Sequence, residues 1–371
     1  MLNNRATADG TAAYARRHPE LSGNFRPMLD GLSVSSIGIG TYLGEPNEET
    51  DRAYADAIES ALLGGINMID TAVNYRFQRG ERTIGKVLGE LIGSGALRRE
   101  EVVVATKGGY LTFDGSMPPD PRGWFEEHFV RNGIIGSGDL VEGAHCMTPR
   151  YLGAMLEMSR ANLGLDTIDI YYIHNPETQL ATVEHPQFLE RMRRAFEFLE
   201  KQVADGKIGV YGTATWGGYR LGPDERQHLQ LEELVKIAHD IAGRGHHFRV
   251  IQLPFNLAMP EALTLANQQL PDRRGTALRA AVGYGMAVCA SASLMQGRLA
   301  RGLPQIVTQA FRGMETDAQR ALQFVRSAPG INVALIGMKS TDHVKEVLDA
   351  AHQPPASIET FSTLFTPSKS A

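Results

Sequence analysis

Four polar side chains stand at or just past the ends of three β-like runs, and together they form one chemical set. They are Asp70, Tyr75, Lys107 and His174. In a closed barrel of parallel strands, all strands point their carboxyl ends at one mouth, so residues far apart in sequence meet there. A carboxylate, an ammonium, a phenol and an imidazole at one mouth suit proton transfer to a carbonyl oxygen. We therefore expect these four residues to be catalytic.

The elements that would position this set are eight short apolar runs that alternate with amphipathic stretches. The runs are nearly continuous in apolar residues, which is typical of strands buried on both faces; they cover residues 34–40, 66–69, 102–106, 168–173, 208–212, 249–253, 286–290 and 332–336. Apolar residues between them recur with helical spacing. Eight β-then-α units predict an α/β fold, a (β/α)8 TIM barrel. A turn at Asp30-Gly31 predicts a hairpin at the barrel bottom.

Two segments stand apart from the repeating units. Residues 1–24 are polar and alanine-rich, and we expect a flexible N-terminal extension outside the fold, with residues 25–371 as a single barrel domain. The connection 108–149 after the third run is far longer than most loops, and long loops in compact domains are usually functional or disordered. It holds five aromatic residues, too many for a disordered linker. Because it leaves a strand at the catalytic mouth, we expect it to cover that mouth.

Composition excludes several classes of partner. The formal net charge of -5 gives no electrostatic case for binding nucleic acid or an anionic membrane. No apolar stretch approaches the roughly 20 residues that span a bilayer. Two cysteines, Cys146 and Cys289, cannot form a disulfide framework, which favours a reducing cytoplasm. The pairs His145-Cys146 and His246-His247 lack further spaced ligands, so no metal site is predicted.

The motifs resemble those of the aldo-keto reductases over residues 26–352. The matching stretches are Gly38-Ile-Gly-Thr41, Asp70-Thr-Ala-Val-Asn-Tyr75 with Gly80-Glu81, Ala105-Thr-Lys107, and residues 162–174 ending at His174. The resemblance implies that NAD(P)H delivers hydride to a carbonyl carbon while Tyr75 donates the proton. A free phenol has a pKa of about 10, so Tyr75 needs help to transfer its proton near neutral pH. By the same resemblance, the neighbouring Lys107 would favour the phenolate and lower that pKa. Asp70 would hold Lys107 by an ion pair, and His174 would orient the carbonyl oxygen.

The resemblance also implies a cofactor site built mainly from the second half of the chain. The residues it assigns to the cofactor are Gly40, Thr41, Thr213, Ala214, Gln252, Ser291, Leu294, Gly297, Arg298, Gly337, Lys339, Ser340, His343 and Glu346. Lys339, Ser340 and His343 would meet a 2′-phosphate, which favours NADP(H) and leaves NAD(H) open. Tyr42 and Trp216, both just past strands, would line the substrate pocket.

The chain departs from the family pattern where the nicotinamide would bind. Thr213-Ala214 stands in place of the usual Ser-Asn pair, and Val347 replaces an adenine-binding asparagine. Ser291 stands where the family stacks a tyrosine on the nicotinamide, so either that ring face is empty or another ring, Trp216 or Phe255, covers it. These departures bear on cofactor affinity more than on the catalytic set.

Several functions remain open on the sequence alone. The leading one is an NADPH-dependent oxidoreductase that interconverts a small-molecule carbonyl (an aldehyde, ketone or sugar) and its alcohol. The alternatives are an NAD(P)-dependent sugar or alcohol dehydrogenase, and a barrel that retains the site as a non-catalytic binding or regulatory protein. A metallohydrolase is disfavoured because the first strand ends in Gly38-Ile-Gly-Thr41 with no His-x-His. The substrate, the physiological direction and the oligomeric state are not indicated.

Overall fold

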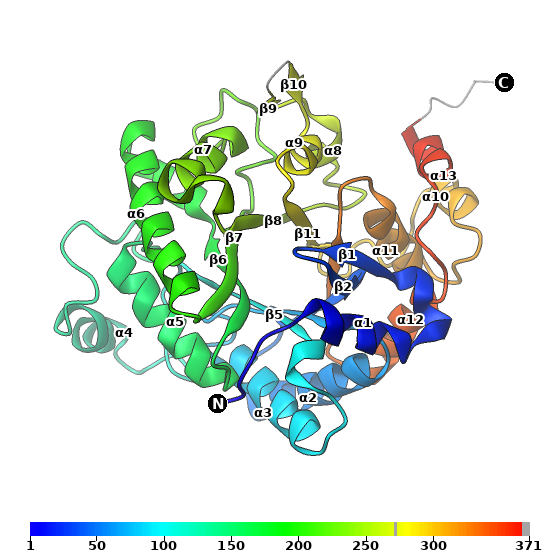
Figure 1. The fold of residues 1–371 in the computed structure, drawn as a ribbon, viewed down its shortest axis with the longest axis horizontal. Coiled ribbons are helices and arrows are strands. Elements are labelled where there is room, and N and C mark those ends of the chain that lie inside the picture. Colours follow the sequence, from blue (N-terminus) through cyan, green and yellow to red (C-terminus); the bar gives the residue numbers. More distant parts are fainter. Residues whose placement is uncertain (271–272, 366–371) are drawn as a thin grey trace.

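Eight parallel strands close into a barrel in the computed structural model, which describes residues 1–270 and 273–365. The strands follow the order β11-β12-β3-β4-β5-β6-β7-β8 around the barrel. Figure 1 labels β5 to β8 and β11 of this barrel, with helices around them. Their bounds are β3 (Ile37–Gly40), β4 (Met68–Asp70), β5 (Val103–Gly108), β6 (Ile168–His174), β7 (Ile208–Ala214), β8 (Phe248–Pro254), β11 (Ala287–Ser291) and β12 (Val333–Gly337). The predicted (β/α)8 barrel is confirmed.

Helices surround the barrel and bury the outer apolar face of its strands. The main ones are α2 (Glu48–Leu63), α3 (Arg79–Gly93), α5 (Pro149–Leu163), α6 (His185–Ala204), α7 (Leu231–Ala242), α9 (Ala277–Gly283), α11 (Asp317–Ser327) and α12 (Thr341–Ala351). Shorter elements are α8 (Glu261–Thr264), β9 (Gln268–Gln269), β10 (Arg274–Gly275), α10 (Gln305–Ala310) and α13 (Ile358–Ser362). Inside the barrel, alternate strand residues such as Met68, Tyr172 and Cys289 form a second buried cluster. In the part of the chain that the structure describes, no helix has the length and apolar character needed to cross a membrane.

The predicted hairpin closes one end of the barrel. β1 (Phe25–Met28) pairs antiparallel with β2 (Leu32–Ser35), and both lie across the barrel end in Figure 1. Met28 and Val34 pack onto the interior cluster. The first predicted strand, 34–40, is therefore two elements: its first residues belong to β2, and the barrel strand β3 begins at Ile37.

Residues 1–24 pack against this closed end, which corrects the expectation of a flexible extension outside the fold. They form α1 (Ala8–Arg16) and a 3-10 helix over Pro19–Asn24. Tyr14 is fully buried and its hydroxyl donates to the carbonyl oxygen of Leu62. The backbone N–H of Ala6 donates to Asp169 Oδ1 over 2.7 Å. A few buried anchors fix a segment whose average composition is polar.

The long connection 108–149 forms its own small cluster at the side of the barrel. It contains α4 (Pro121–Phe125) followed by a π-helical turn over Glu126–Val130. Phe129, Ile135 and Cys146 pack against Tyr151 and Met155 of α5. Figure 1 accordingly shows α4 at the outer edge of the molecule beside α5. The segment is thus an ordered packing element, as its aromatic content indicates.

Candidate active site

Strand alternation brings the predicted catalytic side chains to one mouth. Successive strand residues point to opposite faces, and Met68, Ala105 and Tyr172 point into the barrel. Two residues further along β4, β5 and β6 stand Asp70, Lys107 and His174, which therefore face the interior at the carboxyl ends of their strands. Tyr75 follows in the loop after β4.

Lys107 is the centre of a buried polar chain. Its Nζ donates to Asp70 Oδ2 over 2.6 Å and to the carbonyl oxygen of Thr71 over 2.7 Å, and lies 3.4 Å from Tyr75 Oη. From the far side of the barrel, Gln252 Nε2 donates to Asp70 Oδ1 over 2.7 Å. The Lys107 side chain is 1% exposed and that of Asp70 7%, so the ion pair is screened little by water. The carboxylate, ammonium and phenol are thus linked in series.

Burial and the neighbouring charges set the protonation states of this chain. Burial raises the pKa of the Tyr75 phenol; Lys107 acts to lower that pKa, as the sequence predicts, but only offsets part of the effect. Burial acts to lower the pKa of Lys107, yet the charge of Asp70, aided by Tyr75, outweighs it and the pKa is raised. The expected net lowering of the phenol pKa is therefore corrected: at neutral pH, Tyr75 is a protonated acid beside a charged lysine.

His174 completes the set and is held by aromatic rings. Its ring centroid lies 5.9 Å from that of Tyr75 and 5.0 Å from that of Tyr110, both edge-on. Burial, and then the charge of Lys107, lower the pKa of His174 well below its ordinary value. The imidazole is therefore neutral at neutral pH and can donate a hydrogen bond to a substrate oxygen from one ring nitrogen.

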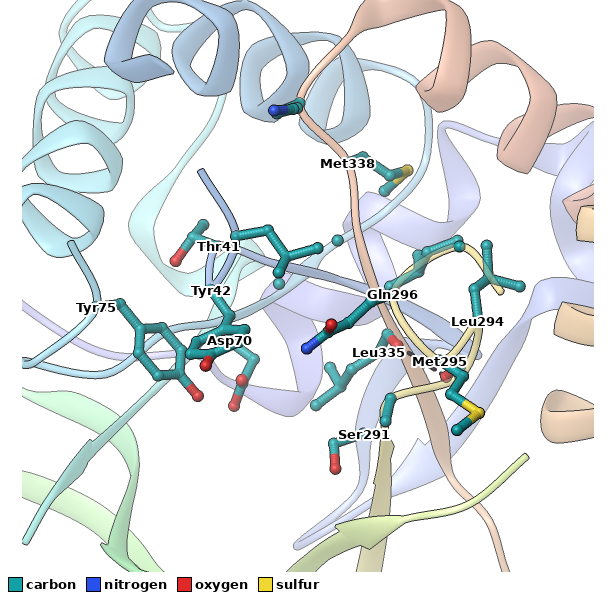
Figure 2. A pocket seen from close by; sticks show the side chains of 18 of the residues that line it. Thr41, Tyr42, Asp70, Tyr75, Ser291, Leu294, Met295, Gln296, Leu335 and Met338 are labelled. Atoms are coloured by element: carbon teal, nitrogen blue, oxygen red, sulfur yellow. Dashed lines mark hydrogen bonds between the residues drawn. The ribbon is translucent and has the colours of Figure 1, made fainter. Parts of the chain in front are cut away.

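Asp70, Tyr75 and His174 line one cavity of about 850 Å³, and Lys107 lies behind them in contact with Asp70 and Tyr75. Figure 2 shows Tyr75 and Asp70 on one side and the loop carrying Leu294, Met295 and Gln296 on the other, with Gln296 directed toward the middle. Twelve of the residues predicted to bind cofactor line this cavity: Gly40, Thr41, Ala214, Gln252, Ser291, Leu294, Gly297, Arg298, Gly337, Lys339, His343 and Glu346.

Two predicted cofactor residues do not line the cavity. Thr213 is fully buried, and its hydroxyl lies 2.7 Å from that of Tyr219, because its neighbour Ala214 is the residue that faces the barrel interior. Ser340 is the N-cap of α12, where its hydroxyl accepts from the backbone N–H of His343. Both assignments are therefore corrected with respect to side-chain contact.

The predicted pocket aromatics Tyr42 and Trp216 both line the cavity and are 58% and 53% exposed. Phe255 does not: it is fully buried and stacks on Phe324 with centroids 5.4 Å apart. Within the described segment 108–149, Tyr110 alone lines the cavity. The expectation that this insertion covers the mouth is corrected, since most of it packs beside the mouth against α5.

Several lining residues escaped the sequence prediction. Asn175 follows His174 directly in a left-handed conformation (φ 44°), and Asn74 precedes Tyr75. Each asparagine could have been identified because it is adjacent in sequence to a predicted catalytic residue. Ala292, Met295 and Gln296 also have positive φ, in the loop after β11. The residue types at these three positions do not predict a positive φ. Within the described ranges, no group of three or more histidine, cysteine, aspartate and glutamate side chains could hold a metal ion.

The part of the cavity next to β11 and β12 has the donor chemistry that a phosphorylated dinucleotide needs. Arg298, Lys339 and His343 supply cationic or hydrogen-bonding groups for phosphate, and Leu294, Leu335 and Met338 supply apolar surface. The glycines that line it leave the backbone accessible. The residues present thus fit a nicotinamide dinucleotide.

Comparison with known proteins agrees with this chemistry. The model of the aldo/keto reductase family matches residues 36–221. A 6-dehydroglucose reductase of Novosphingobium aromaticivorans is 28% identical over 189 residues, which are 50% of this chain and 49% of that protein. The NADH-specific methylglyoxal reductase of Escherichia coli is 29% identical over 229 residues, 60% of each chain. These alignments span about half to three-fifths of the relatives' length.

One solved structure extends the likeness in fold to nearly the whole chain. The aldo/keto reductase from Klebsiella pneumoniae, in complex with NADP and acetate, superposes with a TM-score of 0.61 at 21% identity. The match covers 94% of this chain and 97% of that one. The likeness supports the barrel architecture beyond residue 221.

Proposed function

Because the chain belongs to the aldo/keto reductase family, we propose that it is an NADPH-dependent oxidoreductase that interconverts a small-molecule carbonyl and its alcohol, with Tyr75 as the proton donor. The observation that carries this proposal is the buried series from Asp70 through Lys107 to Tyr75, which opens into the cavity. In this series Tyr75 lines the cavity, and the Lys107 ammonium lies 3.4 Å from its hydroxyl.

The residues divide the work of carbonyl reduction. Bound NADPH supplies the hydride. As negative charge grows on the carbonyl oxygen, the Tyr75 O–H bond breaks and the proton passes to that oxygen, forming the alcohol O–H bond. The ammonium of Lys107 stabilises the phenolate left behind, and Asp70 balances the charge of Lys107. Neutral His174 donates a hydrogen bond to the same oxygen and orients it.

The raised pKa of Tyr75 determines how each direction responds to pH. Reduction needs the phenol, which is the form present at neutral pH because burial raises its pKa. Oxidation of the alcohol needs the phenolate as a base, so its rate should keep rising as pH increases through the alkaline range. Either physiological direction, carbonyl reduction or sugar or alcohol oxidation, is compatible with this site.

We assign the cofactor as NADP(H) on the side chains of Lys339 and His343, which line the cavity beside α12. They supply positive charge and an N–H donor for a 2′-phosphate at a helix N-terminus. The methylglyoxal reductase relative is NADH-specific by name, and the solved neighbour holds NADP, so both dinucleotides belong in the test. The substrate panel should contain small aldehydes, ketones and aldoses.

The decisive experiment replaces the proposed proton donor and follows absorbance of the reduced cofactor. Tyr75→Phe should lower turnover by about 10² or more, because a general acid contributes roughly that much. Cofactor dissociation constants should stay nearly unchanged. Tyr284→Phe is the matched control, since its hydroxyl lies outside this cavity and has no hydrogen-bond partner among the described residues. Turnover of Tyr75→Phe within about threefold of wild type would refute the assignment.

A further inference from the structure

His145 lies fully buried in the insertion, directly behind the end of β6. Its Nε2 lies 2.7 Å from the carbonyl oxygen of His174, and its Nδ1 lies 2.7 Å from Gln179 Nε2. Gln179 in turn accepts a hydrogen bond at Oε1 from the guanidinium of Arg191. An uninterrupted polar relay therefore runs from α6 through the insertion to the backbone of the proposed catalytic histidine.

Every link in this relay has a fixed direction. Arg191 can only donate, so it must face the Gln179 oxygen, and the Gln179 amide nitrogen must face His145. That nitrogen also only donates, so Nδ1 of His145 accepts. The His174 carbonyl only accepts, so Nε2 of His145 carries the proton. Burial lowers the pKa of His145 to about 4, which keeps this neutral tautomer in place at neutral pH.

The orientation of the His174 imidazole depends on how its backbone is held, because no hydrogen bond from any described residue to the buried side of the ring fixes it. Its Nδ1 is buried and has no partner among the described residues. The ring is instead positioned by its backbone and by Tyr110, whose ring lies 5.0 Å from both His145 and His174. Gly109 permits this close arrangement: a Cβ there would lie 2.7 Å from the His174 carbonyl oxygen.

We propose that His145 is a positioning residue, through which the insertion holds His174 in the orientation that carbonyl reduction requires. The expected effect on kcat rests on the proposed function. The expected effect on the orientation of the His174 ring rests on the hydrogen-bonded relay alone. A displacement of about 1 Å in a reacting group can cost as much as 10² in rate, so a lost anchor behind His174 should reduce the catalytic step more than cofactor binding.

The kinetic test compares removal of the imidazole with replacement by a side chain of the same reach. His145→Ala should lower kcat about tenfold or more while the NADPH dissociation constant stays within about twofold of wild type. His145→Gln keeps a donor for the His174 carbonyl and an acceptor for Gln179, so it should restore kcat to within about threefold. His128→Ala is the matched control: this histidine lies in the same insertion but is exposed and stacks on Trp124.

A spectroscopic test is independent of turnover. In protein labelled with ¹⁵N-histidine, His145 should show a protonated Nε2 and an unprotonated Nδ1. The ring signals of His174 should shift in His145→Ala but stay in place in His145→Gln and His128→Ala. Should His145→Ala fail to fold, Gln179→Ala replaces it, because it removes the donor to Nδ1 and leaves the ring present; a fall in kcat and a shift of the His174 signals are then expected.

The proposal is overturned by unchanged kcat in His145→Ala, by equal losses in the Ala and Gln variants, or by a protonated Nδ1 in His145. A wild-type protein that turns over no carbonyl or alcohol would instead overturn the proposed function. The ring signals would still decide the role of His145 in that case.

Discussion

Protonation of His145 should make the stability of this protein depend on pH. The imidazole is fully buried and neutral, with a folded-state pKa of about 4 against 6.5 in the unfolded chain, because burial disfavours its charged form. Below pH 6.5 the unfolded state therefore binds a proton that the folded state refuses. Stability falls as pH falls through 6.5, and this loss levels off once pH reaches about 4.

The size of the effect follows from the two pKa values. The gap between 6.5 and about 4, at roughly 1.4 kcal/mol for each pH unit, limits the loss to roughly 3 kcal/mol. By the linkage relation, about 2 kcal/mol of the free energy of unfolding is lost as pH falls from about 7 to about 5. His174, whose pKa is also lowered, adds a loss of the same sign.

Comparison with a variant isolates the contribution of His145. Urea unfolding of wild type and His145→Gln should be measured at several pH values across this window. The wild-type free energy of unfolding should fall by about 2 kcal/mol more than that of the variant, since glutamine does not titrate. The two main causes of the lowered His174 pKa, burial and the charge of Lys107, are common to both proteins. Parallel pH dependences would mean that His145 is solvated or already charged in the folded state, and the neutral-tautomer reasoning would be wrong.

Four further substitutions test other parts of the site. Lys107→Met leaves the buried Asp70 carboxylate without its cation, so urea unfolding should show a loss of about 3–5 kcal/mol; unchanged stability would contradict the buried ion pair. Lys339→Ala should weaken NADPH about fivefold by fluorescence titration without affecting NADH, and equal effects on both would remove its phosphate role. Ser291→Tyr should tighten NADP(H) roughly two- to tenfold by stacking; weaker binding would show that another ring already covers that face. Glu177→Ala removes the buried carboxylate that accepts the backbone N–H groups of residues 216–218, so KM should rise about tenfold; unchanged KM would mean that this loop keeps its position without the carboxylate.

The barrel and the meeting of Asp70, Lys107 and His174 at one mouth could be predicted because both follow from simple periodicities. Continuous apolar runs mark strands buried on both faces, and a two-residue alternation then determines which terminal side chain faces inward. The same alternation also predicts that the Thr213 side chain faces outward from the barrel, because its neighbour Ala214 faces the interior. A serine directly before a helix is a standard N-cap, and Ser340 occupies that position.

The packing of the two irregular segments could not be predicted in the same way. In residues 1–24, burial rests on separate anchors, among them Ala6, Tyr14 and Leu21, which are too far apart to form a periodic pattern. In the insertion, aromatic content correctly indicated an ordered segment. The position where the insertion packs depends on the surface that α5 presents to it. No local pattern in the sequence of the insertion indicates that position.

The insertion supports both halves of the proposed chemistry from outside the cavity. Tyr75 is followed by three non-glycine residues with positive φ, Arg76 to Gln78, at 49°, 54° and 74°. Such backbone costs on the order of 1 kcal/mol or more per residue and persists only where the surroundings hold it. Gln78 Nε2 donates to the carbonyl oxygen of Phe113, and the N–H of Gly115 donates to that of Phe77. The segment that anchors His174 through His145 therefore also braces the turn that carries the proton donor. It lines the cavity with one residue, Tyr110, so we expect changes elsewhere in the insertion to alter kcat before they alter substrate preference.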